Sequence, residues 1–566
     1  MYCLKNFSQS KLRATTRTSC YIVFLFLLTL NICYSKNQSG IASAHPMATM
    51  AGINVLEKGG NAFDAAIAVA STLAVVEPFG SGIGGGGFFL FYKASEDKYT
   101  FIDARETAPA FSNSKMFNDD TGNYSRKKAL DSPLSAAIPG LPAALGYIAE
   151  FYGRLDLTSS MAESINIAKK GFLVTERYRR MAGFRLECLN QFDKSSDIFL
   201  DKMKVPQIGF KIKQPELANT LSLISKDSSK FYNGRIAEDL VAGVIEGGGL
   251  WQLTDLSNYS IKERQPVVED FNEIRLISAP PPSSGGLILI QALKILENFE
   301  LPNYSQGDRV HLIVESMKKG FRDRAKFLGD PDFNNIDVDG LISTEYIERL
   351  RQEISINSAS SSENIVETKT LEGDQTTHFS IIDHEGNIAS VTLSINYPFG
   401  SCFVAGKTGV LLNNEMDDFS ISPATPNAYG LVGLKPNSIE ANKRPLSSMT
   451  PTILDSVTNT AVLGTPGGSR IISMVLLSIL EYINGKTPDA WVSAPRYHHQ
   501  FIPNKIQFEK GAFSAELRKA LIKKGHELKE INRLYGNMQA LLLEKEDGKV
   551  TVASDPRGEG ASLVLE

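Results

Sequence analysis

The sequence changes character abruptly at Thr376. Residues 357–375 are rich in Ser, Glu, Thr and Asn and hold few apolar residues, which is typical of an exposed, mobile segment. Directly after them, residues 377–382 and 388–394 carry the β-branched and apolar residues of strands, with a turn over 383–387. This pattern predicts a hairpin whose first strand begins where a polar tract ends, and the fold has to accommodate that boundary.

Helices and strands are mixed along the rest of the chain. Residues 42–76 are apolar or small apart from a break at 58–61, which predicts two helices joined at a glycine C-cap. The glycine-rich run 81–87 leads into the apolar residues 88–92, which predicts the entry to paired strands. Hairpin strands mixed with helices favour a layered α/β or α+β sheet sandwich. Helical periodicity continues over residues 141–152, 217–224, 288–296 and 310–324.

The charge of the chain excludes a polyanion-binding protein. Lys and Arg number 59 and Asp and Glu number 63, which gives a net charge of −4. Such a balance offers no basic field for the backbone of a nucleic acid. We therefore expect no nucleic-acid partner.

The N-terminus has the pattern of a secretory leader. Four basic residues between Lys5 and Arg17 precede an uncharged stretch over 18–35, whose apolar centre is 20–33. That centre is short for a membrane span, which needs about 20 apolar residues, and suits a signal peptide. We expect residues 1–35 to be a signal peptide cleaved after Ser35, with an uncleaved signal anchor as the alternative. In both cases the body of the protein lies beyond the membrane.

Two cysteines, Cys188 and Cys402, remain after the leader. Two cysteines make no disulfide framework, and neither has a CxxC partner or a His at ligand spacing. We expect two buried side chains that act as small apolar groups.

Several short segments match known sequence motifs but lack the structural context that the chemistry of those motifs requires. Gly82, Gly84 and Gly87 fit GxGxxG, but a strand follows where a dinucleotide site needs a helix. Residues 400–408 have five rather than four residues between the glycines of a P-loop. His498 and His499 are adjacent and would point to different sides, which favours packing roles over a metal site.

Thr376 is a candidate nucleophile. If the chain were cut before it, one residue would carry both a hydroxyl and an α-amine. That amine has an ordinary pKa of about 7.7–8.0 and could accept the hydroxyl proton near neutral pH. A Thr-Thr pair that opens a strand is also explained by β propensity alone.

Blocks of sequence around Thr376 resemble the signatures of the γ-glutamyltranspeptidase family in order and spacing. The resemblance extends from about Gly40 to Arg557, and it implies an α+β, N-terminal-nucleophile hydrolase with a four-layer αββα sandwich. It also implies a precursor that cleaves itself into a large subunit, 36–375, and a small subunit, 376–566, which form one domain and a heterodimer. We expect the two subunits to associate without a disulfide. The matching blocks are 103–109, 280–286, 375–380, 411–419, 444–449 and 466–470.

The resemblance implies roles in the reaction for four residues. Thr376 would be the nucleophile in self-cleavage and in turnover, and Ser394, where many members have Thr, would support its amine. Gly467 and Gly468 would donate backbone N–H groups to an oxyanion hole. No cofactor or metal is implied.

The resemblance also implies a binding site for a glutamyl group. Arg105 would bind the α-carboxylate, helped by Ser447 and Ser448. The α-ammonium would be received by Glu415, Asp418 and Asn396, and Tyr429 would lie in a lid loop over 423–433. The plainer alternatives are that Arg105 pairs with Asp103 or Glu106 at the surface, and that residues 415–418 form a solvated acidic turn.

The implied activity is transfer of the γ-glutamyl group of glutathione or related γ-glutamyl compounds to water or to amino-acid or dipeptide acceptors. The loop over 423–433 and the leader favour a bacterial enzyme that is periplasmic or secreted, with a membrane-anchored form as the alternative. One rival interpretation is a related acylase of a non-glutamyl amide, and another is an inactive, processed binding protein.

Overall fold

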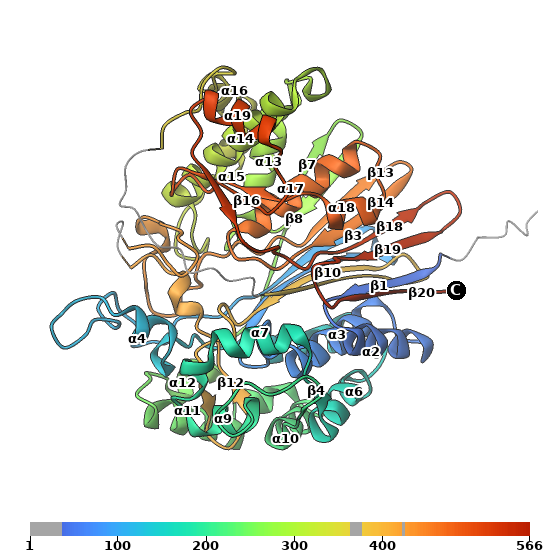
Figure 1. Ribbon diagram of the computed structural model, residues 1–566. Helices are drawn as coiled ribbons and strands as arrows, with labels where there is room; N and C mark the ends of the chain where they lie inside the picture. The colour runs from blue at the N-terminus through green and yellow to red at the C-terminus, as the bar shows by residue number, and fades with distance from the viewer. Residues whose placement is uncertain (1–36, 363–375, 422–424) are drawn as a thin grey trace, which may run out of the picture.

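Two antiparallel sheets pack face to face and helices cover both outer faces (Figure 1). This computed structural model describes residues 37–362, 376–421 and 425–566, and it confirms the α+β class and the four-layer αββα sandwich. Within those ranges no helix combines the length and apolar character needed to cross a bilayer. The predicted leader, 1–35, and most of the polar tract, 363–375, lie outside the described residues.

The first sheet contains the predicted hairpin at its centre. Residues 377–394 form two strands that pair with each other and with strands from near the N-terminus. The seven strands are, in spatial order, β20 (Ala561–Leu565), β1 (Ser39–Ser43), β9 (Thr377–Ile382), β10 (Ile388–Ser394), β2 (Gly86–Lys93), β3 (Lys98–Ala104) and β6 (Lys262–Arg264).

The prediction of helix from residue 42 is wrong at its start. Strand β1 includes Ala42 and Ser43, because β1 is inserted between β9 and β20. The helix begins only at Pro46, which suits the first helical position, after His45 as N-cap. The two predicted helices are α2 (Pro46–Glu57) and α3 (Ala62–Val76), with the break where it was expected.

Alternation along β2 explains why this sheet has helices on one side and a sheet on the other. Phe89 and Phe91 belong to the apolar core shared with α3, where Phe91 lies 4.7 Å from the ring of Phe63. Phe88 and Leu90 belong to the core shared with the second sheet. Successive side chains of a strand point to opposite faces, so a strand buried on both faces is apolar throughout.

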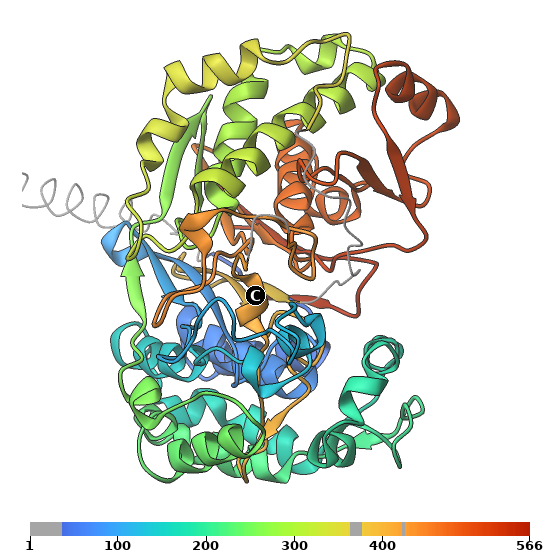
Figure 2. The same ribbon diagram turned by 90° about the vertical axis from the view of Figure 1, so that its left-hand side faces the viewer.

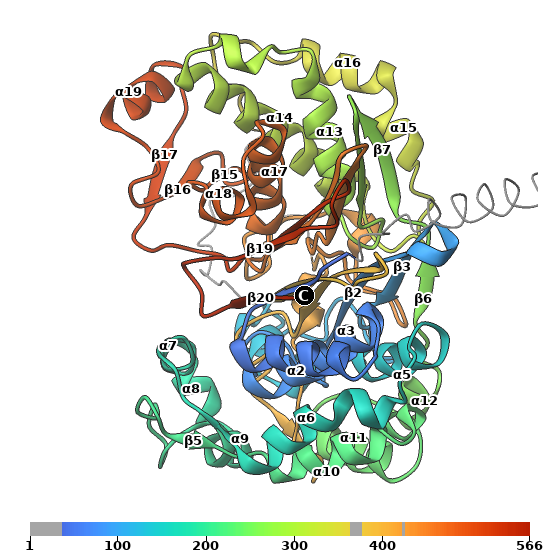
Figure 3. The same ribbon diagram turned by 90° about the vertical axis from the view of Figure 1, so that its right-hand side faces the viewer.

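The second sheet supports the other helical layer, as the two side views show (Figures 2 and 3). Its strands are β19 (Val550–Ser554), β18 (Gln539–Glu544), β14 (Asn459–Gly464), β13 (Thr452–Ser456), β8 (Ile274–Ser278) and β7 (Val267–Phe271). Helices α13 (Gly285–Glu297), α14 (Gln306–Phe327) and α17 (Arg470–Ile483) cover it.

The remaining predicted helices are confirmed as α5 (Leu141–Phe151) and α10 (Pro215–Ile224). The other helices lie mainly at the two outer faces (Figure 1). The longer ones are α6 (Leu157–Lys170), α7 (Glu176–Phe184), α9 (Asp193–Phe199), α11 (Arg235–Glu246), α16 (Thr344–Gln352) and α19 (Ala515–Lys523).

Cys188 and Cys402 form a disulfide. Both are buried, as expected, but the expectation of two separate apolar groups is wrong. The bridge also joins residues from the two predicted subunits, so the expectation of an association without a disulfide is wrong as well. The two cysteines are 214 residues apart, and only the fold brings their Cα atoms to 5.9 Å.

Candidate active site

Thr376 and Ser394 lie side by side at the ends of neighbouring strands. The β9–β10 pairing sets Thr377 opposite Leu393, so the next residues outward, Thr376 and Ser394, are also neighbours. Their hydroxyl oxygens are 3.3 Å apart and both residues are buried. Ser394 Oγ also accepts a hydrogen bond of 2.8 Å from the backbone N–H of Asn396. This second bond orients the Ser394 hydroxyl beside Thr376.

A small pocket opens next to Thr376, and its wall holds most of the residues predicted from the sequence. Glu415 is outside the wall but bonds to Arg105 within it, and Gly467 directly precedes a wall residue. The predicted residues in the wall are Arg105, Thr376, Ser394, Asn396, Asp418, Tyr429, Ser447, Ser448 and Gly468. The pocket wall also contains Leu431, Met449, Ser469 and Ile471, which were not predicted as site residues and lie close in the chain to residues that were.

Arg105 is bound to the two carboxylates that were predicted to receive an ammonium. Its Nη1 donates to Glu415 Oε2 and its Nη2 donates to Asp418 Oδ2, each at 2.6 Å. Its Nε donates to Pro445 O at 3.1 Å. The guanidinium is therefore held by three acceptors that fix the plane of its fork.

The plainer alternatives are wrong in placing these residues at the surface, although Arg105 does form an ion pair with Glu106, at 3.5 Å. Arg105 is 1% exposed and Glu415 is fully buried, so neither belongs to a solvated turn. Asp103 does not pair with the Arg105 side chain, because its carboxylate accepts from Arg264 at 2.7 Å and from the backbone N–H of Arg105. The buried arrangement excludes an ordinary surface ion pair.

The site has more carboxyl groups than cations. Burial raises the pKa of Glu415 to about 7, although the charge of Arg105 acts in the opposite direction. Glu106, which the sequence analysis considered only as a surface partner, lies 3.5 Å from Arg105. Burial and the neighbouring Glu415 raise the pKa of Glu106 well above its ordinary value. Three carboxyl groups thus lie around the Arg105 guanidinium, and a second buried guanidinium, that of Arg324, interacts with Asp418 as well.

Ser448 and Asn396 each present a polar atom to the pocket. The buried Ser448 Oγ has no hydrogen-bond partner among the described residues, so it can donate to a ligand. The Asn396 side chain donates from Nδ2 to Asn414 O at 3.0 Å, and this leaves its amide oxygen as the acceptor for a ligand. Ser447 lies in the wall too, but its hydroxyl accepts from the backbone N–H of Met449.

The loop between β14 and α17 carries Gly467 and Gly468. Both have positive φ, 145° and 57°, a region that side-chain-bearing residues seldom adopt. Their carbonyls accept from the first turn of α17, at Arg470 N and Ile471 N. Within the described part of the chain neither glycine N–H donates to a backbone carbonyl. These two donors are therefore available to an anion at the helix N-terminus.

Tyr429 packs directly over Gly468. A Cβ at position 468 would lie 2.3 Å from the Tyr429 ring, so only glycine fits there. Tyr429 Oη donates to Asn396 O at 2.6 Å, and Asp417 accepts from the backbone N–H of Ala428 at 2.8 Å. The described part of the predicted lid loop, 425–433, is thus bonded to the site that it covers.

Glu77, which was not predicted, is a further buried acid beside Thr376. Its Oε2 accepts from Thr377 Oγ1 at 2.9 Å, next to Thr376 in the chain. Burial raises the pKa of Glu77 to about 7, and Arg177 opposes this. The two bonded residues are 300 positions apart, so no local pattern could indicate the contact.

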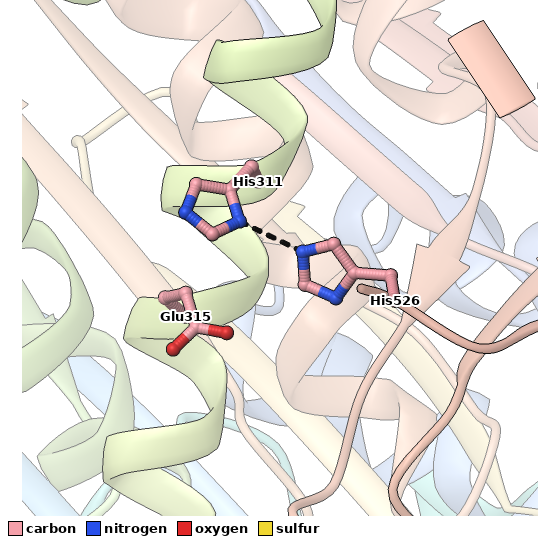
Figure 4. Close-up of side chains that lie close together, drawn as sticks. All are labelled: His311, Glu315 and His526. Atoms are coloured by element: carbon pink, nitrogen blue, oxygen red, sulfur yellow. Dashed lines mark hydrogen bonds between the residues drawn. The ribbon is translucent and has the colours of Figure 1, made fainter. Parts of the chain in front are cut away.

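His311, Glu315 and His526 form the group that could hold a metal among the described residues (Figure 4). Their ligand atoms lie within 4.8 Å of one another. His311 Nε2 bonds to Ser355 O at 2.8 Å, which makes its Nδ1 the acceptor of the 2.8 Å bond from His526 Nε2. A divalent ion would have to displace that proton and lie beside Lys318, whose Nζ is 3.1 Å from Glu315. The group is a hydrogen-bonded network, and it does not line the Thr376 pocket.

His498 and His499 are buried, as expected for packing histidines. His498 bonds through Nδ1 to Ser473 Oγ and through Nε2 to Gln500 Oε1. Both ring nitrogens are therefore used within the protein.

Comparisons with known proteins agree with this architecture. A family model described as gamma-glutamyltranspeptidase matches residues 48–565. The "Glutathione hydrolase proenzyme" of Escherichia coli (strain K12) is 39% identical over 528 residues, which cover 92% of this chain and 90% of that protein. Cephalosporin acylase from Bacillus halodurans has a TM-score of 0.82 at 26% identity, with 93% of this chain and 96% of that chain covered. Gamma-glutamyltranspeptidase from Helicobacter pylori has a TM-score of 0.54 at 34% identity, covering 56% and 92%.

Asp417→Asn should change how stability depends on pH. Burial raises the pKa of Asp417 to about 7 in the folded protein, whereas an unfolded Asp titrates near 3.9. The folded state therefore binds the extra proton, and the free energy of unfolding falls by up to about 1.4 kcal/mol per pH unit as pH rises between these values. Asparagine can keep the bond from Ala428 N without this loss.

Thermal unfolding of Asp417→Asn and wild type from pH 4 to 8 measures the effect, with the exposed Asp120→Asn as control. As pH rises, the melting temperature of Asp417→Asn should increase relative to that of wild type. The difference between Asp120→Asn and wild type should stay constant. Parallel curves for all three proteins would contradict the assignment.

Proposed function

The chain belongs to the γ-glutamyltranspeptidase family, and we propose that it cleaves itself before Thr376 and then acts as a glutathione hydrolase and γ-glutamyltransferase. The observation that carries the proposal is one pocket in which the Thr376 hydroxyl lies with Arg105 and Asp418. A glutamyl group has a carboxylate and an ammonium on one carbon, and these charges match Arg105 and the surrounding carboxylates.

Self-cleavage would start from the Thr376 hydroxyl. The oxygen attacks the carbonyl carbon of Gln375, the peptide bond breaks, and an ester and a free α-amine form on Thr376. Water then hydrolyses the ester and leaves two chains, 36–375 and 376–566. Thr376 has φ of 112°, a value that a β-branched residue rarely adopts, and this strain at the bond to be cut supports the step.

Turnover would use the same hydroxyl. The Thr376 amine takes its proton, the oxygen attacks the γ-carbonyl of the substrate, and the departing amine receives the proton. The oxyanion would be held by the N–H groups of Gly467 and Gly468, because these backbone donors lie at the pocket and bond to no backbone acceptor among the described residues. Removing one such donor typically costs about 10²–10³ in kcat. Water or an acceptor amine then releases the glutamyl group.

We assign the glutamyl-binding roles from the pocket geometry. Arg105 and Ser448 would donate to the α-carboxylate, with Ser447 forming the adjacent wall. Glu415, Asp418 and the amide oxygen of Asn396 would receive the ammonium. The substrates would be glutathione and other γ-glutamyl compounds, with amino acids or dipeptides as acceptors.

We propose that the protein works outside the cytoplasm, in the periplasm or as a secreted enzyme. The leader-like pattern over 1–35 supports this. So does the Cys188–Cys402 disulfide, because disulfides persist in oxidising compartments. An uncleaved leader would give the membrane-anchored alternative.

An acylase of non-glutamyl amides is the main rival. In the structure Arg105 bonds to both Glu415 and Asp418 without a ligand, so an acyl group that lacks an ammonium would not leave these charges unpaired. Asp418 and Glu415, which lie at or beside the pocket wall, still favour a ligand with an ammonium, and an assay separates the two activities.

Wild type should show turnover of a chromogenic γ-glutamyl anilide and little turnover of the glutaryl anilide, which lacks the α-amino group. Arg105→Lys should lower kcat/KM for the γ-glutamyl anilide by about 10- to 100-fold, because an ammonium cannot reproduce the fork of the guanidinium. Self-cleavage needs no carboxylate clamp and should continue. Preference for the glutaryl anilide would support the acylase, and no turnover at all would support a binding protein.

Purified protein should separate under reducing, denaturing conditions into two fragments, the smaller of which begins at Thr376. Thr376→Ala should remain one uncut chain, because it lacks the attacking hydroxyl. N-terminal sequencing and gel electrophoresis measure both outcomes. A small fragment with any other first residue would refute the cleavage site.

Ser394→Ala should lower kcat and shift the acid limb of the pH profile. The acid limb reports protonation of the Thr376 amine, and the Ser394 hydroxyl lies beside Thr376. Ser394→Thr keeps a hydroxyl and should lose little activity. Profiles of kcat/KM against pH for the three proteins test this. An unmoved acid limb in Ser394→Ala would remove Ser394 from the catalytic residues.

A further inference from the structure

The disulfide joins two segments that the proposed cleavage would place on different chains. Cys188 lies on α8 (Leu186–Leu189), and Cys402 lies in the loop that follows β10. The bond before Thr376 lies between them in the sequence, so cutting it leaves the bridge intact. The two chains would then be held by a covalent bond as well as by packing.

The loop that carries Cys402 has an unfavourable backbone. Asn396, Phe399 and Cys402 have φ values of 68°, 57° and 58°, in a region that side-chain-bearing residues seldom occupy. Such residues persist only where surrounding contacts force the conformation. Loop 395–402 therefore depends on contacts from outside itself.

Some of those contacts come from residues 412–414, and others come from the segment around Cys188. Arg185 Nε donates to Pro398 O at 2.9 Å, and Arg185 Nη2 donates to Gly400 O at 3.0 Å. The Arg185 guanidinium also stacks over the ring of Tyr397, 5.1 Å from its centroid. The disulfide lies among these bonds, so it forms part of one clamp on the loop.

A third bond from the same side reaches the end of the loop. Ser195 Oγ, just beyond Cys188 in the large chain, donates to Cys402 O at 2.6 Å. The bridge itself is enclosed, since Cys188 is 3% exposed and Cys402 is fully buried. A reductant in solution therefore has no direct access to its sulfur atoms in the folded protein.

The clamped loop forms one side of the glutamyl pocket. Asn396 lines the pocket, and its carbonyl accepts the bond from Tyr429 Oη. The ring of Tyr397 contacts that of Tyr429, with the centroids 6.2 Å apart. A shift of the loop would move Asn396 and the ring that covers Gly468.

We propose that the Cys188–Cys402 disulfide links the two chains of the processed enzyme and positions the loop that carries Asn396. The inference rests on the proposed cleavage before Thr376. The bridge forms when each thiol loses its hydrogen, and the two electrons and two protons pass to a protein disulfide, which is reduced to a dithiol. Asn396 would contact the substrate, and the cysteines act only through its loop.

Gel electrophoresis of wild type, alkylated while it is denatured, tests the covalent link. One band at the summed mass without reductant and two bands with reductant are expected, together with a cross-linked peptide of Cys188 and Cys402 by mass spectrometry. Two bands without reductant and alkylated Cys188 and Cys402 would overturn the link and leave the cleavage intact. One band in both conditions would instead refute the cleavage, and with it the linked two-chain enzyme.

Cys188→Ser and Cys402→Ser test the positioning role as a matched pair. Each removes the bridge, but only Cys402→Ser alters the loop itself. Both should raise KM for the γ-glutamyl anilide several-fold and change kcat less, because the loop binds the substrate and does not supply the nucleophile. Wild type kept folded with reductant should retain its KM, because the bridge is enclosed. An unchanged KM in Cys188→Ser, or a rise confined to Cys402→Ser, would overturn the positioning role.

Discussion

The pairing of β9 with β10 is the interaction on which the candidate active site depends. Because Thr377 lies opposite Leu393, Thr376 and Ser394 meet at the edge of the sheet. A slip of one residue would turn each side chain to the other face of the sheet. The neighbouring strands β1 and β2 pair with this hairpin and are buried on both faces, so the register is fixed by two cores at once.

The buried charges of the proposed glutamyl pocket are paired with one another. Moving Arg105, Glu415 and Asp418 out of water is costly, and breaking such a pair typically costs about 3–5 kcal/mol. The mutual hydrogen bonds offset this cost without a ligand. A bound glutamyl group would replace these contacts with contacts to its own carboxylate and ammonium. The cost of removing the protein charges from water is paid during folding, so binding does not add it again.

Local patterns allowed much of the fold to be predicted. The hairpin at 377–394 and the helices α5, α10, α13 and α14 follow from periodicity, because each one has its own apolar face or alternation. The start of α2 was misplaced, since pairing with β9 and β20 decides the state of residues 39–43.

The site was predictable only as a set of residues. The family resemblance placed Arg105, Glu415 and Asp418 in one site. It did not predict the bonds among them, because 310 and 313 residues separate the partners in the sequence. The disulfide between Cys188 and Cys402 was not predicted either, because 214 residues separate the two cysteines in the sequence. Glu77 was not predicted and Glu106 was expected at the surface, because burial, which raises the pKa of both, is a property of the folded chain.

The elements around the pocket form a chain of contacts, in which each one positions the next. The segment around Cys188 holds the loop of Asn396, Asn396 accepts from Tyr429, and the Tyr429 ring lies on Gly468. A side chain at 468 would push the ring away and break the bond to Asn396. The absence of a Cβ at this position therefore serves two purposes: it permits the positive φ that directs the N–H groups, and it allows an aromatic ring to cover them. Covered donors lie in a less polar environment, where a hydrogen bond to a developing oxyanion is stronger than in water.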